Sequence, residues 1–447
     1  MSSTSRKSFT AILSGFFLIL AGLIYWQVIA DLSDHPLNPR RYDVFRQPRG
    51  AILDRWGTPL ACTVRQNGDY VRVYACPSLS HVTGYFHQRY GMTGLERTYN
   101  SSLAQGQEVH TTIDLALQQK LEALMEGRVG AAIAMNPKTG EVLALLSSPY
   151  VDPNKLDEFW SDYAADPRSP FVNRATRGQY PPGSAVKPFV LAAALADRIT
   201  FPEERWQDSG RVVLSGRTIS NFQSQGWGSL TSLEALANSS NVVFAQLAAK
   251  LGPRLLDTLR QCGLGEALPF PLGSAAGKLP PAEQSAYGWG QIGIGQGSLL
   301  VTPLQMAAAV SAIANGGQLM RPYLVEEVRG GWRLPRLQRP VVYSQAVPQW
   351  TAAAVREGMV LAVQQGTAKG AALPGVIAAG KTGTAETLTG DDHAWFIGFA
   401  PAHDPRIAVA VVLEHGGLAS ETAAPLGGLV MQAALEACTQ GGMQIER

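Results

Sequence analysis

An uncharged apolar run at residues 9–30 constrains this chain more than any other feature of its sequence. A segment of this length can cross the hydrocarbon core of a bilayer, but only as a helix that satisfies its own backbone hydrogen bonds. Tyr25 and Trp26, near its end, are residue types that suit the interface between membrane and water. The run therefore predicts a transmembrane anchor, preceded by a cytoplasmic tail at residues 1–8.

The charges beside the run favour an N-terminus inside the cell and an exported remainder. Arg6 and Lys7 precede the run, whereas Asp31 and Asp34 follow it. The excess of positive charge on the N-terminal side is not clear-cut. Four arginines lie within reach on the C-terminal side of the run: Arg40, Arg41, Arg46 and Arg49. A cleaved signal peptide is the alternative, although Ala30 would end a poor cleavage site after an over-long apolar core.

The composition describes a globular, loop-rich protein of more than one domain. The chain has 447 residues, of which 46% are hydrophobic and 16% are charged. The net charge of +2 is spread along the chain and forms no basic stripe, which excludes nucleic acid as a partner. The histidines lie in no ligand spacing, so the sequence predicts no metal site and no cofactor.

Residues 31–108 are rich in Arg, Tyr, Gly and Pro and contain only short apolar stretches. This composition predicts small strands and turns, and therefore a small membrane-proximal pedestal or linker domain. No cysteine of the chain belongs to a C-x-x-C motif. In an oxidising compartment Cys62 and Cys76 could form a disulfide, and buried free thiols are an equal alternative.

Residues 109–447 have the patterns of a larger domain. Apolar positions that recur every three or four residues predict a helix after Glu108, with Thr112 or Asp114 as its cap. Two apolar strands joined by the turn at 136–140 predict a hairpin. Ala-rich helices, later strands and a final helix follow. We therefore expect an α+β domain, with a mixed sheet flanked by helices and a helical cluster.

A serine and a lysine three residues apart form the first candidate catalytic pair. Ser184 and Lys187 open an apolar helical run, and residues at this spacing share a helix face. A neutral lysine can take the hydroxyl proton when burial or a nearby cation lowers its pKa. A serine cap followed by a surface lysine is the structural alternative. However, Lys187 is the only lysine with a serine three residues before it.

The only S-x-N triplet of the chain, Ser239-Ser240-Asn241, interrupts two Ala-rich helical segments. A hydroxyl and an amide on such a turn could carry a proton to a leaving nitrogen and hold a substrate carbonyl. In the alternative interpretation, Ser239 simply caps the helix that follows.

The segment 381–384 reads K-T-G-T and lies between an apolar stretch and an apolar strand. It predicts an exposed strand edge with a cation and hydroxyls, able to bind a carboxylate and to pair with an extended peptide. Residues 138–140 also read K-T-G, but they lie in the hairpin turn before the other motifs. The tripeptide alone is therefore weak evidence.

The order S-x-x-K, S-x-N and K-T-G resembles that of penicillin-binding transpeptidases and serine β-lactamases. The chain is more similar to the class B penicillin-binding proteins, over residues 45–435. The family phrases occur in order as PRGAILDRWGTPLA (48–61), YGMTGLERTYN, TTIDLALQ, NPKTGEVLALLSSPYVDPN, NRATRGQYPPGS and IGQGSLLVTPLQMAAA. Trp56 departs from the usual Asn of the first phrase, and Ala185-Val186 depart from the common Thr-Phe between nucleophile and lysine.

The resemblance implies a role for each motif residue. Ser184 would be acylated, with Lys187 as its base. Ser239 would relay a proton to the leaving amine, and Asn241 would position Lys187 and the substrate amide. Lys381 would bind the terminal carboxylate and help to keep Lys187 neutral.

The same resemblance implies the substrate-binding groups. Thr382, Gly383 and Thr384 would line the substrate, with the two threonines as hydroxyl donors. The backbone N–H groups of Ser184 and Thr384 would form an oxyanion hole, in which each donor is worth about 3 kcal/mol.

The function implied is that of a peptidoglycan D,D-transpeptidase that acts on stem peptides ending in D-Ala-D-Ala and is acylated by β-lactams. It would be a single-pass protein of the bacterial cytoplasmic membrane with its catalytic domain outside. The stretch between anchor and catalytic domain is too short for a glycosyltransferase domain. We therefore expect a monofunctional enzyme beside a multipass glycan polymerase of the shape, elongation, division and sporulation type.

Two other hypotheses remain open. A D,D-carboxypeptidase or a β-lactamase would use the same acylation groups but pass the acyl group to water. A non-catalytic β-lactam sensor, or a structural subunit of the wall-synthesis complex, is the third hypothesis. The intact motifs and the short cytoplasmic tail argue against it.

Overall fold

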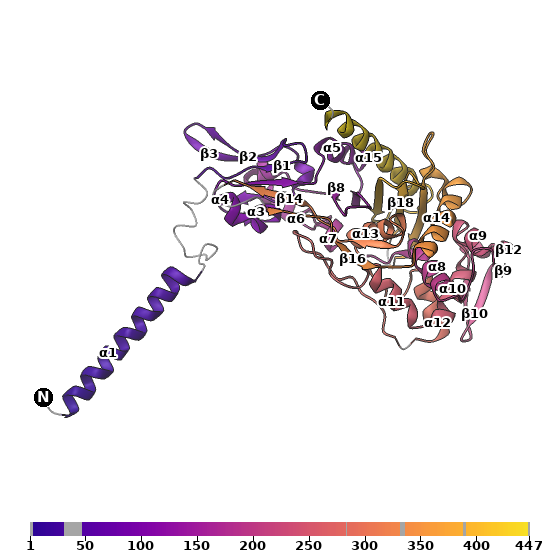
Figure 1. The fold of residues 1–447 in the computed structure, drawn as a ribbon, viewed down its shortest axis with the longest axis horizontal. Helices are drawn as coiled ribbons and strands as arrows, with labels where there is room; N and C mark the ends of the chain where they lie inside the picture. The colour runs from indigo at the N-terminus through magenta and orange to yellow at the C-terminus, as the bar shows by residue number, and fades with distance from the viewer. Residues whose placement is uncertain (1–2, 31–46, 283, 331–335, 388–389, 446–447) are drawn as a thin grey trace.

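The computed structural model describes residues 3–30, 47–282, 284–330, 336–387 and 390–445. The helix α1 (Ser3–Ile24) continues into the π-helical turn η1 (Tyr25–Ile29) and stands apart from the folded body (Figure 1). Its segment Phe9–Val28 has a mean hydropathy of 2.0 and is not buried, so it is long and apolar enough to cross a membrane. The flanking charges that bear on orientation lie partly outside the described residues: Asp31, Asp34, Arg40, Arg41 and Arg46.

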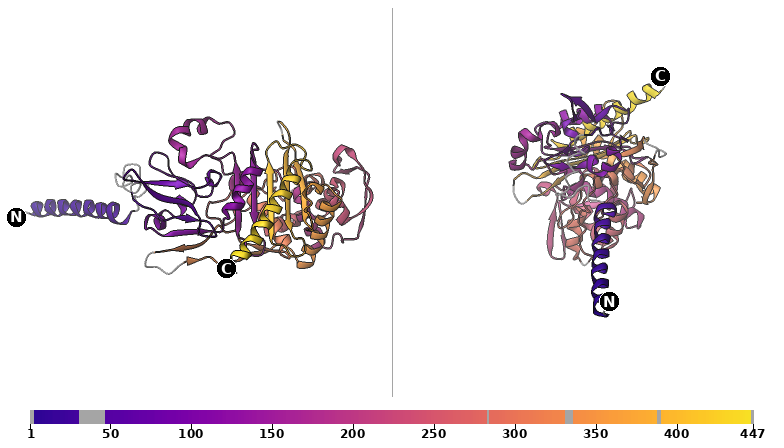
Figure 2. Two further views of the ribbon diagram at one scale, coloured as in Figure 1. Left: turned by 90° about the horizontal axis from the view of Figure 1, so that it is seen from above. Right: turned by 90° about the vertical axis from the view of Figure 1, so that its left-hand side faces the viewer.

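A six-stranded sheet forms the part of the body nearest α1, in the order β15-β14-β6-β1-β2-β3 (Figures 1 and 2). The strands are β1 (Ile52–Leu53), β2 (Pro59–Gln66), β3 (Asp69–Tyr74), β6 (Glu108–Thr111), β14 (Val325–Arg329) and β15 (Arg336–Leu337). Only β1 and β6 pair in parallel within this described sheet. Since β14 and β15 come from far along the chain, the sheet joins the segment that follows α1 to the larger C-terminal part of the chain.

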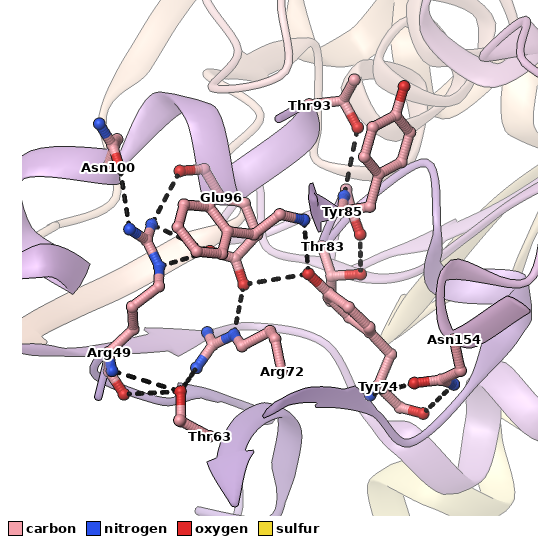
Figure 3. Close-up of polar contacts among 12 residues, drawn as sticks. Arg49, Thr63, Arg72, Tyr74, Thr83, Tyr85, Thr93, Glu96, Asn100 and Asn154 are labelled. Atoms are coloured by element: carbon pink, nitrogen blue, oxygen red, sulfur yellow. Dashed lines mark hydrogen bonds and ion pairs between the residues drawn. The ribbon is translucent and has the colours of Figure 1, made fainter. Parts of the chain in front are cut away.

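Glu96 is fully buried beside this sheet and pairs with two arginines (Figure 3). Its Oε2 lies 3.1 Å from Arg49 Nη2, and its Oε1 lies 2.6 Å from Arg72 Nε. Arg49 also donates to Asn100 Oδ1 at 3.0 Å and lies over the ring of Phe86. Arg49 belongs to the family phrase at 48–61, and Glu96 belongs to the phrase YGMTGLERTYN. The buried ion pair gives each of these two residues a structural role.

A five-stranded antiparallel sheet forms the centre of the larger C-terminal part, in the order β17-β18-β19-β7-β8. The strands are β7 (Gly130–Met135), β8 (Val142–Ser148), β17 (Ala379–Ala385), β18 (His393–Ala400) and β19 (Ile407–Leu413). The predicted hairpin is confirmed as β7 and β8. The two alanines at 132 and 134 pack toward α5 (Leu115–Leu124) and α15 (Ala423–Ile445), whereas Ile133 packs in the core that contains α13 (Pro303–Ala314). Both faces of the sheet are therefore covered.

A helical cluster flanks the β17 edge of this sheet, and two of its helices begin at the motif residues Lys187 and Asn241. Its helices are α8 (Lys187–Ala196), α9 (Ser232–Ala237), α10 (Asn241–Leu251), α11 (Arg254–Gln261), α12 (Ala286–Gly293) and α14 (Gln349–Gln364). Four short strands lie beside it: β9 (Arg205–Asp208), β10 (Arg211–Leu214), β11 (Arg217–Ser220) and β12 (Gly228–Thr231). The expected α+β architecture, a sheet with flanking helices and a helical cluster, is confirmed.

Shorter elements complete the described part of the chain. They are η3 (Pro77–Leu79), β4 (Phe86–His87), β5 (Gly91–Met92), α3 (Gly94–Thr98), α4 (Asn100–Ala104), η4 (Pro153–Lys155), α6 (Leu156–Ala165), α7 (Arg174–Arg177), η5 (Gly183–Val186), η6 (Phe222–Ser224), β13 (Gln318–Met320), β16 (Val342–Gln345) and η7 (Lys369–Ala371).

The two open questions about local structure have clear answers. Asp114, and not Thr112, caps α5, because its side chain accepts a hydrogen bond from the backbone of Leu117. Trp56 donates to the same carboxylate at 3.1 Å, so this departure from the family phrase ties the pedestal loop to α5. The cysteines, including Cys62 and Cys76, are all free thiols.

Candidate active site

Ser184 lies on η5, a 3₁₀ turn that leads directly into α8. Side chains three residues apart eclipse each other in such a turn, which places Lys187 on the same side as Ser184. Gly183 has a φ of +52°, and a side chain there would meet the carbonyl oxygen of Thr384 at 2.4 Å. Glycine therefore allows the turn to pack directly against β17. Ser184 itself is partly exposed, whereas Lys187 is fully buried.

Lys187 connects the first motif to the second. Its Nζ donates to the carbonyl oxygen of Ser239 at 2.6 Å, to Ser239 Oγ at 3.2 Å and to Asn241 Oδ1 at 2.7 Å. Burial lowers the pKa of Lys187 well below its usual range, and the charge of Lys381 lowers it further. A lysine in this environment can reach the neutral form that a general base requires.

Lys381 reaches the same serine from strand β17. Its Nζ donates to Ser239 Oγ at 2.9 Å and to the carbonyl oxygen of Thr382 at 2.9 Å. The side chain is fully buried, and this burial lowers the pKa of Lys381 to about 7. The three motifs predicted from sequence thus meet at one hydroxyl group, Ser239 Oγ.

Ser240, rather than Ser239, is the N-cap of α10. Its Oγ accepts a hydrogen bond from Val243 N at 3.1 Å, so the interpretation of Ser239 as a helix cap is wrong. Ser239 has a φ of +59°, in the left-handed region that residues other than glycine rarely adopt. Strain of this kind concentrates at functional sites, and here it accompanies a hydroxyl shared by two lysines.

Strand β17 is an edge strand, as the sequence predicted, but the Lys381 side chain is buried rather than exposed. A Cβ on Gly383 would lie 2.6 Å from Ala185 N and 2.6 Å from the carbonyl oxygen of Pro182. Gly383 is therefore needed for close packing of the strand against η5, and Trp395 fixes the same loop by donating to the carbonyl oxygen of Pro181 at 3.0 Å.

The threonines of the third motif are held by other parts of the chain. Thr382 Oγ1 lies 2.8 Å from Thr367 Oγ1, and Thr384 Oγ1 accepts from Ala419 N at 3.3 Å. Because the Thr384 oxygen accepts this bond, its hydroxyl hydrogen stays available to a substrate. Thr367 was not expected from the sequence, since only the fold brings the end of α14 beside β17.

The second K-T-G lies apart from this site. Lys138 lies in the turn between β7 and β8, where its Nζ pairs with Asp404 at 2.6 Å. More than half of each side chain of this pair is exposed. The position of the later K-T-G, beside apolar strand segments, therefore identified which of the two copies lies with the other motifs.

The arrangement contains a partly exposed hydroxyl, a buried lysine suited to act as a base, a bridging hydroxyl and a second lysine on a strand edge. These are the groups needed for nucleophilic acyl transfer: a nucleophile, its base, a proton relay and a cation for a carboxylate. Within the described residues, no group of His, Cys, Asp and Glu side chains could hold a metal ion.

Comparison with known proteins identifies the class of protein that this fold and site define. Residues 130–432 match the family model of the penicillin binding protein transpeptidase domain, and residues 49–127 match that of the penicillin binding protein A dimerisation domain. The chain therefore belongs to the penicillin-binding protein transpeptidases, and the class B resemblance is confirmed.

Particular relatives agree along nearly the whole chain. The peptidoglycan D,D-transpeptidase PbpA of Mycobacterium tuberculosis is 35% identical, over 98% of this chain and 99% of its own. The enzyme of the same name from Mycolicibacterium smegmatis is 34% identical, over 97% of this chain and 99% of its own. A solved structure of penicillin-binding protein A from M. tuberculosis, a ceftriaxone acyl-enzyme complex, has a TM-score of 0.83 at 34% identity and covers 88% of this chain and 100% of its own.

Proposed function

We propose that this chain is a monofunctional peptidoglycan D,D-transpeptidase with Ser184 as its nucleophile. Ser184 Oγ attacks the carbonyl carbon of the penultimate D-Ala of a stem peptide while Lys187 takes the hydroxyl proton. The bond to the terminal D-Ala then breaks, and Ser239 passes the proton to the departing nitrogen. An acceptor amine next attacks the Ser184 ester, which forms the cross-link and returns a proton to Ser184.

The other motif residues bind and orient the substrate in this scheme. Lys381 receives the terminal carboxylate, and Asn241 holds Lys187 and the substrate amide. Thr382, Gly383 and Thr384 line the peptide, which would pair with the free edge of β17 as an added strand. The N–H groups of Ser184 and Thr384 stabilise the oxyanion, at about 3 kcal/mol per donor.

The shared hydrogen bonding of Ser239 Oγ to Lys187 and Lys381 is the observation that best supports this scheme. It gives the proton a route from the base to the leaving group and keeps a cation beside the base. A β-lactam fits the same chemistry, since opening its ring amide leaves the acyl group on the serine and the amine still attached to the drug.

The anchor and the polymerase partner belong to the same proposal. We place residues 1–8 in the cytoplasm, residues 9–30 in the membrane, a pedestal at 31–108 and the transpeptidase domain at 109–447 outside. This orientation lets the site meet peptidoglycan, and the pedestal would contact a multipass glycan polymerase of the shape, elongation, division and sporulation type.

Protease added to spheroplasts tests this orientation. It should digest the body of the protein, and full protection of the body would reverse the orientation.

Labelling with fluorescent penicillin tests the nucleophile. The wild-type protein and Ser101→Ala, an exposed pedestal control, should be labelled covalently, whereas Ser184→Ala should stay unlabelled and folded. Labelled Ser184→Ala protein would disprove the mechanism. The absence of label on the wild-type protein would favour the hypothesis of a structural subunit.

A further inference from the structure

A buried carboxylate outside the three motifs lies behind the S-x-N turn. Asp208, the last residue of β9, is 2% exposed and forms no salt bridge among the described residues. Its Oδ1 accepts from Gly210 N at 2.8 Å, and it also accepts from Asn221 and from Ser240 Oγ. A buried charge without a cationic partner is costly, so this carboxylate needs a reason to be there.

Asp208 fixes the orientation of the Asn221 amide. Asn221 Nδ2 donates to both carboxylate oxygens, at 2.8 and 2.9 Å. An ionised carboxylate can only accept hydrogen bonds, so the amide must present its Nδ2 to Asp208 and its Oδ1 to the other side. That Oδ1 accepts from Asn241 N at 2.7 Å and from Val242 N at 3.2 Å.

Asp208 fixes the helix cap by the same logic. Ser240 Oγ donates to Asp208 Oδ2, which leaves its lone pair to accept from Val243 N at 3.1 Å. The first three backbone N–H groups of α10, those of Asn241, Val242 and Val243, therefore all bond to side chains that Asp208 orients. A negative charge near the N-terminus of a helix is also favourable by itself.

The network ends at the side chain that binds the candidate base. Asn241 Nδ2 donates to the carbonyl oxygen of Ser220 at 2.8 Å, next to Asn221 in the chain. This bond directs Asn241 Oδ1 toward Lys187 Nζ, 2.7 Å away. The position and the orientation of the amide that holds Lys187 thus depend on residues that Asp208 orders.

We propose that Asp208 is a positioning residue of the active site, which holds the Ser239-Ser240-Asn241 turn where it receives Lys187. This inference rests on the proposed roles of Ser184 and Lys187. Asp208 touches neither the nucleophile nor the base directly in the described structure, so it acts through Asn221 and Ser240.

The charge of Asp208 gives this role a second, measurable consequence. The charged groups that act on Lys187 are Lys381 from β17, which lowers its pKa, and Asp208 from β9, which raises it. The ring of Phe244, from α10, is its aromatic neighbour. Removal of the Asp208 charge should therefore lower the pKa of Lys187. In the profile of acylation rate against pH, the rise at low pH, here called the acid limb, should then move to lower pH.

The test measures acylation of the full-length protein by fluorescent penicillin as a function of pH. Asp208→Asn should lower the maximal rate by about tenfold or more, since a displacement of ~1 Å can cost about 100-fold, and should shift the acid limb to lower pH. Asp208→Glu, which keeps the charge, should leave the limb in place. Glu234→Gln, in the cap of the neighbouring α9, is the matched control and should behave as wild type.

Asn221→Ala tests the same route while the carboxylate remains. It should lower the rate and leave the acid limb unmoved. A wild-type rate for Asn221→Ala, or an unmoved acid limb for Asp208→Asn, would overturn the proposal. Wild type and Ser184→Ala are measured in parallel. If wild type is labelled and Ser184→Ala is not, the nucleophile assignment holds, and either contradicting result then concerns the role of Asp208 alone.

Discussion

Lys187 and Lys381 donate to the same oxygen, Ser239 Oγ, at 3.2 and 2.9 Å. Burial lowers the pKa of both side chains, and the charge of Lys381 lowers the pKa of Lys187 further. Lys381 comes from the edge strand that we expect to bind a carboxylate. A substrate that delivers this carboxylate would favour the charge on Lys381 and leave Lys187 as the neutral base.

Lys381→Ala should slow acylation by β-lactams far more than Lys381→Arg. Loss of the cation weakens carboxylate binding and lets Lys187 regain its proton. Stopped-time labelling gels would give the rates, and Lys138→Ala provides a matched control because the chain carries a second K-T-G away from the site. If both Lys381 variants react like wild type while Lys138→Ala does not, the assignment of the third motif is wrong.

The rate of acylation should fall as the pH rises through about 7, where buried Lys381 loses its proton. The rate falls, rather than rises, because the charged form of Lys381 binds the substrate carboxylate. Below this pKa the Lys381 cation is present, and above it the carboxylate loses its partner. Lys381→Arg keeps its charge at high pH. A pH profile of the second-order rate constant for this variant should therefore lack the alkaline fall. The same fall in both proteins would assign it to another group.

The penicilloyl adduct on Ser184 should persist. Fast hydrolysis requires a base for water, and class A lactamases supply a glutamate in an E-x-x-x-N loop between the second and third motifs. No glutamate between Asn241 and Lys381 is followed four residues later by Asn: Glu266, Glu283, Glu326, Glu327 and Glu357. Adduct mass followed over hours after a chase with unlabelled drug checks this. Multiple turnovers within minutes would make the protein a β-lactamase.

Glu96→Gln should destabilise the pedestal by about 3–5 kcal/mol, because it leaves Arg49 and Arg72 without their buried counter-charge. Denaturant unfolding of the full-length protein in detergent gives the free energy. Glu158→Gln, at an exposed carboxylate of α6, is the control and should change it little. An unfolding free energy equal to that of wild type would mean that the two arginines are satisfied without Glu96.

Local patterns predicted the elements, and motif order predicted which of them meet. The hairpin of β7 and β8, the helix α5 and the edge strand β17 all follow from periodicity and turn residues. The contribution of Asp208 could not be predicted in this way. Its partners Asn221 and Ser240 lie 13 and 32 residues away, and no local pattern relates them.

The helix cap at Ser239 and the exposed Lys381 were wrong for the same reason: both depend on how distant segments pack. Adjacent serines at 239 and 240 are equally good caps by composition, and only the turn geometry decides which hydroxyl faces the helix and which faces the lysines. Similarly, nothing in the order of the motifs indicated that Lys381 would be buried. Burial depends on β17 packing against η5, where glycines at 183 and 383 allow close approach.

The strand β14 begins in the catalytic half, pairs with β6 in the membrane-proximal sheet, and continues that sheet through β15. Separation of the two halves would therefore require a whole ladder of backbone hydrogen bonds to break. A partner that tilts the pedestal relative to the bilayer would turn Ser184 and the β17 edge through the same angle. In the proposed orientation, the pedestal would therefore set the height and direction at which Ser184 and the β17 edge meet peptidoglycan.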